Sequence, residues 1–142
     1  MATPLPPPSP TDTLLSFDFG TRRTGVATGS LLLGRGEPLE TIAATGEPRL
    51  QRIAALVAEW KPARLLVGVP RHPDGAPHEN TVRAQRFARQ LAARFRLPVE
   101  EVDERYSTVE ARARGAAPDD ADAAAAAVLL EQYLFDLGRS AP

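Results

Sequence analysis

Three acidic residues, Asp18, Glu104 and Asp122, have the chemistry and the local settings from which a metal site can be built. Asp18 lies between Phe17 and Phe19 in an apolar run, and a carboxylate in a core needs polar partners or a cation to compensate its burial. Two carboxylates on strands and a third on a helix would suit Mg²⁺ or Mn²⁺, since both ions prefer oxygen ligands. A metal ion bound in this way can activate water or stabilise a leaving oxygen. We therefore take these three acids as candidate catalytic residues and metal ligands.

Each of the three acids also has a structural explanation that the residues alone leave open. Asp18 can cap the glycine-containing turn that follows it. Glu104 can be the solvated end of a strand, and its position hardly separates it from Asp103. Asp122 lies with two other aspartates at the start of a helix, where acids favour the helix dipole and cap free N–H groups. In favour of a site, Asp122 shares one helix face with Leu129 and Tyr133, which would turn it toward the sheet.

The elements that would position these acids follow from the hydrophobic pattern and the turn residues. The expected strands cover residues 14–19, 25–30, 37–44, 65–69 and 97–102. The expected helices cover residues 48–60, 81–95 and 120–137, with a short helix that begins at Ser107. A meander followed by crossover units predicts an α/β fold. Its mixed five-stranded sheet has three antiparallel meander strands, two parallel strands and helices on both faces, which is the RNase H-like arrangement.

The composition limits the number of domains and the kinds of site and segment that the chain can contain. The 142 residues suit one domain, which we expect over residues 14–138. Five of the first ten residues are proline, so residues 1–13 are expected to form a disordered tail that is not a signal peptide. Without cysteine there is neither a disulfide framework nor a thiolate zinc site. No apolar run reaches the roughly 18 residues of a membrane helix. These features predict a cytoplasmic protein without a membrane segment.

The basic residues predict phosphate contacts near the acids. We expect Arg22, Arg23, Arg71 and Arg105 to bind substrate phosphates, because each lies on a loop or a strand end close to a candidate ligand. The chain has 17 basic and 18 acidic residues and no basic run, so its net charge of −1 argues neither for nor against nucleic acid. The two histidines lie in a proline-rich loop without the spacing of a zinc site, and loop polar residues explain them better.

Four segments, in order along the chain, resemble the YqgF family, which is also called RuvX. They are LSFDFGT (15–21) with GVA (25–27), VGVP (67–70) with DG (74–75), DERYSTVEA (103–111), and Asp122 with its alanine-rich helix. Together they span residues 14 to about 135, which is nearly all of the chain beyond the tail. Two departures stand out: the stretch 114–120 is shorter than usual and lacks lysines, and His72-Pro73 replaces a segment that commonly contains asparagine.

The resemblance implies an RNase H-like nuclease that is related to Holliday junction resolvases and matures the 5′ end of pre-16S rRNA. The family's three acids fall on Asp18, Glu104 and Asp122, with Asp18 bridging two Mg²⁺ or Mn²⁺ ions for phosphodiester hydrolysis. The implied partner is nucleic acid, with RNA favoured and structured DNA as the alternative, together with ribosomal precursor particles. A resolvase of branched DNA and a non-catalytic ribosome-associated or nucleic-acid-binding module remain as competing functions. Either a monomer or a homodimer would fit.

Overall fold

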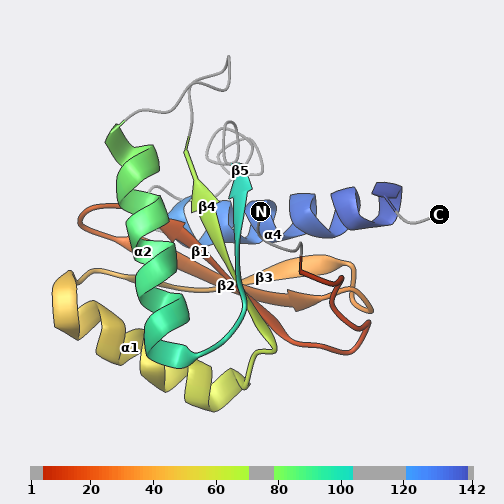
Figure 1. Ribbon diagram of the computed structural model, residues 1–142, viewed down its shortest axis with the longest axis horizontal. Coiled ribbons are helices and arrows are strands. Elements are labelled where there is room, and N and C mark those ends of the chain that lie inside the picture. The colour runs from red at the N-terminus through yellow and green to blue at the C-terminus, as the bar shows by residue number, and fades with distance from the viewer. Residues whose placement is uncertain (1–4, 71–78, 104–120, 141–142) are drawn as a thin grey trace.

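The computed structural model describes residues 5–70, 79–103 and 121–140, which form a mixed five-stranded sheet with helices on both faces (Figure 1). The strands are β1 (Leu14–Phe19), β2 (Thr24–Ser30), β3 (Arg35–Ile42), β4 (Arg64–Val69) and β5 (Val99–Asp103). The helices are α1 (Gly46–Trp60), α2 (Glu79–Phe95) and α4 (Ala121–Ser140). The order across the sheet is β3-β2-β1-β4-β5, with β1, β4 and β5 parallel and β2 antiparallel to both neighbours. The predicted mixed five-stranded sheet is confirmed, and β1 and β4 lie side by side within it.

Some boundaries differ from the predicted ones. β3 begins and ends two residues earlier than expected, and it accommodates Pro38 because an edge strand leaves one side of its backbone unpaired. α4 continues through Gly138, which was expected to end it, since this glycine does not adopt the left-handed conformation of a C-terminal cap. The short helix predicted from Ser107 lies outside the described residues.

The proline-rich segment before β1 packs against the sheet over residues 5–13. The Arg64 guanidinium donates to the Pro6 carbonyl, and the Leu32 amide donates to the Pro10 carbonyl at 2.9 Å. The Ala63 amide donates to the Thr13 carbonyl at 2.9 Å. Proline lacks an N–H but keeps its acceptor, so the segment can be fixed through its carbonyls. Residues 5–13 therefore make defined backbone contacts with the rest of the fold, while residues 1–4 lie outside the described part of the chain.

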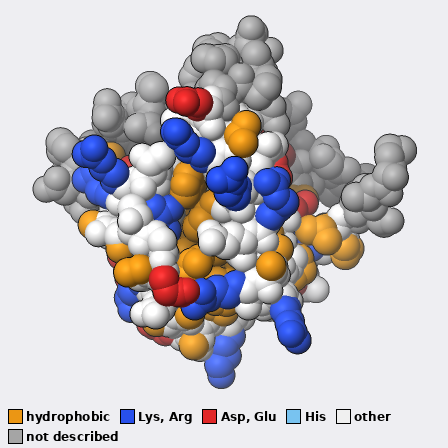
Figure 2. Space-filling model, turned by 60° about the vertical axis from the view of Figure 1, so that its left-hand side comes forward, with side chains coloured by type: hydrophobic (Ala, Val, Ile, Leu, Met, Phe, Trp, Pro, Cys, Tyr) orange, Lys and Arg blue, Asp and Glu red, His pale blue; other side chains and the backbone are white. Residues whose placement is uncertain are grey.

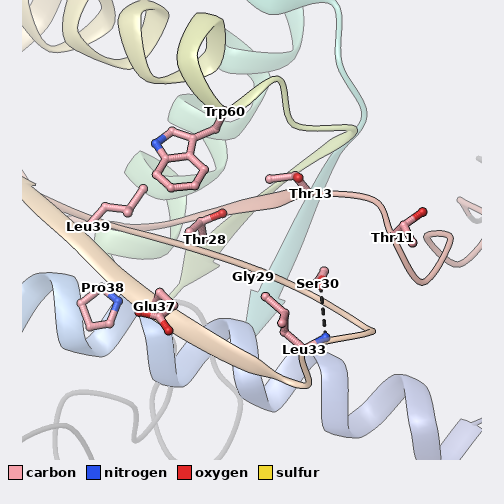
Figure 3. Close-up of a pocket in the computed structure, with 10 residues that line it drawn as sticks. All are labelled: Thr11, Thr13, Thr28, Gly29, Ser30, Leu33, Glu37, Pro38, Leu39 and Trp60. Atoms are coloured by element: carbon pink, nitrogen blue, oxygen red, sulfur yellow. Dashed lines mark hydrogen bonds between the residues drawn. The ribbon is translucent and has the colours of Figure 1, made fainter.

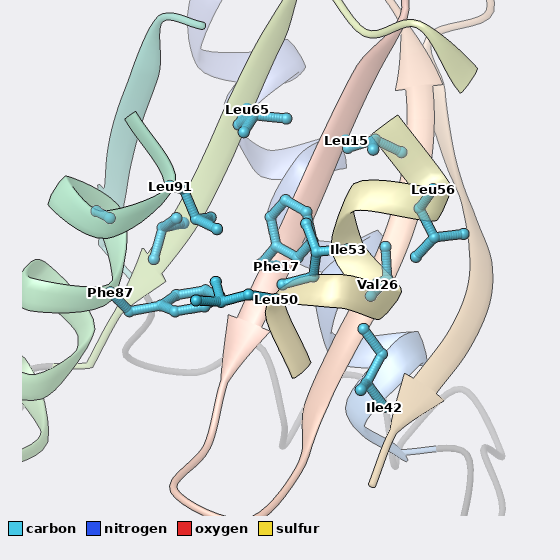
Figure 4. Close-up of a cluster of buried hydrophobic side chains, with 12 residues drawn as sticks. Leu15, Phe17, Val26, Ile42, Leu50, Ile53, Leu56, Leu65, Phe87 and Leu91 are labelled. Atoms are coloured by element: carbon cyan, nitrogen blue, oxygen red, sulfur yellow. The ribbon is translucent and has the colours of Figure 1, made fainter. Parts of the chain in front are cut away.

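Alternation along β1 divides its side chains between two cores. Leu15 and Phe17 point into the core beneath α1 and α2, where Phe87 meets Phe17 edge-on (Figure 4). Leu14 points to the opposite face and packs with residues of α4, and the Ser16 hydroxyl donates to the Ala126 carbonyl of α4 at 2.7 Å. Two-residue periodicity therefore places Asp18, at the carboxyl end of β1, on the α4 face.

Small residues let α4 lie directly on the sheet. A Cβ on Gly25 would come within 1.8 Å of the Asp122 carbonyl oxygen, and a Cβ on Gly36 within 2.6 Å of the Ala127 carbonyl oxygen. Ala27 of β2 contributes to the same surface and packs against the alanines of the helix. The alanine-rich sequence of α4 and the glycines of β2 and β3 thus fit each other. This close approach fixes the height of the α4 N-terminus above the strand ends.

Arg64 joins the far ends of these elements in a buried cluster. Its guanidinium donates to the Tyr133 hydroxyl at 2.9 Å and lies 3.3 Å from a carboxylate oxygen of Glu100. Burial raises the pKa of Tyr133 to about 12, and the neighbouring Glu100 carboxylate adds to the increase. The neutral phenol is therefore the form that the folded protein favours.

The raised pKa predicts a stability loss at alkaline pH. Because the folded-state pKa of Tyr133 exceeds its ordinary value of 10.0, its contribution is complete below pH 10 and disappears as the pH rises toward about 12. A two-unit shift corresponds to about 2–3 kcal/mol. In a Tyr106→Phe variant, tyrosinate absorbance of the folded protein should report Tyr133 alone and show titration near the raised value. Titration of that variant near pH 10 while folded would contradict the expectation.

Candidate functional site

One row of residues crosses the sheet on its α4 face at the carboxyl end of β1. Asp18 pairs with Gly25 of β2 on one side and with Gly68 of β4 on the other, and Gly25 in turn pairs with Thr41 of β3. Directly opposed residues project to the same face, so both lateral neighbours of the Asp18 carboxylate lack a side chain. The partly buried carboxylate therefore has no side chain beside it in the ladder, and on the Gly25 side the backbone of α4 approaches instead.

Gly25 also brings Asp122 to the same place. The space that a Gly25 Cβ would occupy is filled by the Asp122 carbonyl and by the amide nitrogen of Ala123, 2.7 Å from the position of that Cβ. Asp18 and Asp122 are 104 positions apart in the sequence, yet both adjoin Gly25, one across the ladder and the other from above. Of the three predicted acids, these two are within the described residues, and the fold brings them to one end of the sheet.

The Asp122 carboxylate has one oxygen that lacks a hydrogen-bond donor among the described residues. Its Oδ2 atom is buried and makes no hydrogen bond within the described structure, although Arg23 Nε lies 3.4 Å away. The contact between Arg23 and Asp122 is therefore an ion pair without the geometry of a hydrogen bond. The Thr41 hydroxyl of the same row is likewise buried without a hydrogen bond to any described residue. A buried carboxylate oxygen lacking a donor fits a divalent cation, because the cation would supply the missing positive charge.

Glu104 follows the last residue of β5, and it lies outside the described residues together with Arg71 and Arg105. Val102, the penultimate residue of β5, packs with residues of α4. Among the described residues no group of three His, Cys, Asp or Glu side chains is arranged to hold a metal ion. Glu104 as the third ligand therefore stays a prediction.

The turn between β1 and β2 carries the two described arginines that were predicted to bind phosphate. Arg23 lies against Asp122, with 52% of its side chain exposed, and Arg22 is exposed in the same turn. A Cβ on Gly20 would come within 2.5 Å of the Arg23 carbonyl oxygen, so the turn is tight. The structure therefore places Arg23 beside Asp122, and Arg22 is the exposed residue that precedes it in the turn.

Arg49 of α1 binds the backbone of this turn, and the sequence analysis did not identify it as a site residue. It is 6% exposed, donates through Nη2 to the Thr21 carbonyl at 3.0 Å and through Nε to the Ala44 carbonyl at 2.9 Å. Its guanidinium lies 5.0 Å from the centre of the Phe19 ring. Burial lowers the pKa of Arg49 from its ordinary value. The available signal was an arginine in the inward stripe of α1, four positions before Ile53.

Removing this support should cost stability. Arg49→Met keeps much of the side-chain volume but leaves two carbonyls without their charged donor, so we expect a loss of about 2 kcal/mol in the free energy of unfolding. Arg52→Met is the matched control on the next turn of α1, where a largely exposed ion pair with Glu40 should contribute less than about 1 kcal/mol. Urea denaturation of both variants makes the comparison. Equal stabilities for the two would show that Arg49 does not hold the turn.

A separate cavity lies at the other end of the sheet (Figure 3). Its volume is about 300 Å³, and Trp60, Leu39 and Thr13 are among its lining residues. Thr13 precedes β1, whereas Asp18 is near the end of that strand. The cavity is therefore not part of the site that contains Asp18 and Asp122.

Comparison with known protein sequences shows similarity over nearly the whole chain. The family model described as "RuvX: Holliday junction resolvase" matches residues 12–136. A Polaromonas protein named "Putative pre-16S rRNA nuclease" is 62% identical over 125 residues, which cover 88% of this chain and 89% of that protein. A Burkholderia mallei protein with the same name is 55% identical over 130 residues, again with 88% and 89% coverage.

Comparison of the structure supports the fold. RuvC from T. thermophilus, solved in complex with a Holliday junction substrate, is similar with a TM-score of 0.57 at 15% identity, over 90% of this chain and 96% of RuvC. A further structure of Thermus thermophilus RuvC gives a TM-score of 0.54 at 14% identity, over 90% of this chain and 97% of that one. The predicted RNase H-like fold is therefore confirmed. In the part of the chain that the structure describes, the helices are too short or too polar to cross a membrane.

Proposed function

Because the chain belongs to the RuvX family of Holliday junction resolvases, we propose that it is a metal-dependent nuclease that hydrolyses phosphodiester bonds during 5′-end maturation of pre-16S rRNA. The observation that carries the proposal is the meeting of Asp18 and Asp122 at Gly25, in the fold of a nuclease family. Relatives that are 62% and 55% identical to this chain over 125 and 130 residues are named for pre-16S rRNA, which supports that substrate. Such a substrate would place the protein in the cytoplasm, with ribosomal precursor particles as partners.

Asp18, Asp122 and Glu104 would hold Mg²⁺ or Mn²⁺. When bound, the ion supplies positive charge to the reacting phosphate and lowers the pKa of a coordinated water. Asp18, in the centre of the row, would be the shared ligand, and Asp122 would close the site from the α4 side. Glu104 would complete it from the end of β5, if the strand alternation continues by one residue. Gly25, beside Asp18, would let both acids reach one ion, because it admits the backbone of α4 at Asp122.

Arginines would bind the phosphates on either side of the reacting one. Arg23 is paired with Asp122 through a half-exposed contact, and contacts of this kind contribute little to stability. Its guanidinium can therefore leave the carboxylate for a phosphate when a cation takes its place at Asp122. Arg22, Arg71 and Arg105 would act with it, because a planar guanidinium binds two phosphate oxygens at once.

A second candidate function is resolution of branched DNA. It is favoured by the description of the family model and by the likeness to RuvC, which at 15% identity supports the fold alone. A resolvase has to present two active sites to a junction and would act as a homodimer, whereas a ribosomal nuclease can act as a monomer. A protein that holds a large, multiply charged junction across a dimer would be expected to carry a basic surplus. This chain has 17 basic and 18 acidic residues, which favours the RNA substrate.

The test offers both substrates to the purified protein with Mg²⁺ or Mn²⁺. We expect cleavage of a 5′-extended 16S rRNA fragment and loss of that cleavage with a chelator. A four-way DNA junction and a duplex of the same base composition should remain intact. Symmetric nicking of the junction without cleavage of the RNA would favour the resolvase. Absence of cleavage on every substrate, by protein that binds the RNA, would favour the non-catalytic module.

A further inference from the structure

We propose that the outer face of α2 binds the phosphate backbone of the RNA strand that leaves the active site. This α2 arginine face consists of Arg83, Arg86, Arg89 and Arg94. The inference rests on the proposed nuclease function, and it adds a second contact region that lies outside the site of the three acids.

The arginines share one side of the helix. α2 buries Ala84, Phe87 and Leu91, which recur every three to four residues and pack on the sheet. Arg86 and Arg89 lie on the opposite side and are exposed. Figure 2 shows Lys and Arg side chains gathered on this part of the surface. The apolar stripe thus fixes α2 to the core and turns its positive charge to the solvent.

The positive charge on this face is only partly neutralised. Arg83 lies 3.8 Å from Glu79, a distant and exposed contact, and Arg94 pairs with Glu47 of α1 at 2.6 Å. Arg86 and Arg89 form no ion pair with any described residue. Three arginines spaced three residues apart repel one another on a helix, and this repulsion lowers helix stability. A polyanion on the helix would remove the repulsion by neutralising these charges.

The helix begins at the edge of the sheet where the active site lies, although α2 packs on the face opposite α4. The Thr81 hydroxyl donates to the carbonyl of Pro70, which directly follows β4. In β4, Gly68 is the neighbour of Asp18. The first turn of α2 is thereby anchored at the carboxyl edge of the sheet. At the other end of the helix, Arg94 pairs with the N-terminal part of α1.

The length of the face suits several nucleotides. With a rise of 1.5 Å per residue, the eleven steps from Arg83 to Arg94 span about 16 Å. A strand with helical stacking advances about 3.4 Å per nucleotide, so the face would contact roughly four to five phosphates. Phosphate contacts of this kind carry no sequence information, and they would hold the flanking RNA while the acids act on one bond.

The test measures how RNA binding depends on salt, with Asp18→Asn present in every protein so that the RNA stays intact. Arg86→Gln with Arg89→Gln removes the two unpaired charges of the face. Arg35→Gln with Arg52→Gln removes the same number of charges from β3 and α1, where both arginines pair with acids. Anisotropy of labelled 5′-extended 16S rRNA fragment gives the affinity at several salt concentrations.

We expect the slope of log affinity against log salt to become shallower by roughly 1.4 for the α2 pair, because each single-stranded phosphate contact contributes about 0.7. The control pair should bind as the Asp18→Asn parent does. Equal slopes for the two pairs would overturn the inference. With Asp18 restored, the α2 pair should raise KM for an RNA with a long flank and leave kcat unchanged. Normal KM on that RNA would likewise reject the α2 face and leave the nuclease proposal standing, whereas an inactive wild-type protein would reject the proposed function itself.

Discussion

Replacing Asp18 with asparagine is expected to lower the rate of RNA cleavage by roughly 10³-fold, equivalent to about 4 kcal/mol of transition-state stabilisation. Asp18 is the residue whose lateral neighbours are both glycine, and asparagine preserves its shape while it removes the charge that would hold the metal ion. Initial rates with saturating Mn²⁺ make the measurement. Without metal, the variant should be as stable as the wild type or more stable, because it removes one of two neighbouring negative charges.

Asp136→Asn provides the matched control. Asp136 is exposed on the same helix as Asp122, near its other end, and its substitution should leave cleavage unchanged. If Asp18→Asn cleaved RNA at the wild-type rate, Asp18 would not be a ligand of the catalytic metal. A large loss of thermal stability in Asp18→Asn would instead indicate a structural role for the carboxylate, such as capping the turn that follows it.

Gly25→Ala is expected to have the second largest effect. The added methyl would lie 1.8 Å from the Asp122 carbonyl oxygen and 2.1 Å from its carbon, and backbone atoms in a packed helix cannot move aside cheaply. We expect a loss of about 3 kcal/mol in stability. For a chain of this size, that corresponds to a Tm lower by roughly 10 °C. Cleavage should also fall at temperatures where the variant is folded, because α4 would carry Asp122 away from Asp18.

Two further glycine substitutions separate these effects. Gly36→Ala would meet the Ala127 carbonyl oxygen at 2.6 Å, further along α4, and should lower Tm while it impairs cleavage less. Gly138→Ala meets no described atom within 4 Å in a helix and should leave Tm equal or slightly higher. A Gly25→Ala protein with normal Tm and normal cleavage would show that α4 does not position Asp122 against the sheet.

Much of the fold was predictable because its signals are local. The alternation of Leu15, Phe17 and Phe19 predicts which way Asp18 points, and Pro62 predicts the end of α1 at Trp60. The contacts of residues 5–13 were not predictable, because they depend on donors from Leu32, Ala63 and Arg64, which are distant in sequence. Proline content indicates a segment without helix or strand, which is not the same as a segment without contacts.

For the site, the sequence supplied the residue types and the structure supplied the proximity. From the local sequence alone, Asp122 and its two aspartate neighbours would all be interpreted as residues that stabilise the N-terminus of a helix. Its position against Gly25 depends on the small residues of β2 and on the register of β1 and β2, which only the folded chain reveals. Arg49 was missed for a related reason, since the carbonyls that it binds come from two separate loops.

The most direct test of the account is a crystal structure of the protein with Mn²⁺, with the ion located by its anomalous scattering. We expect a peak at the carboxyl end of β1, with carboxylate oxygens of Asp18 and Asp122 at roughly 2.0–2.5 Å and Glu104 completing the site. Crystals of Asp18→Asn grown in the same way should lack the peak. A manganese ion bound elsewhere, or Asp18 and Asp122 turned away from a shared ion, would contradict the proposed metal site.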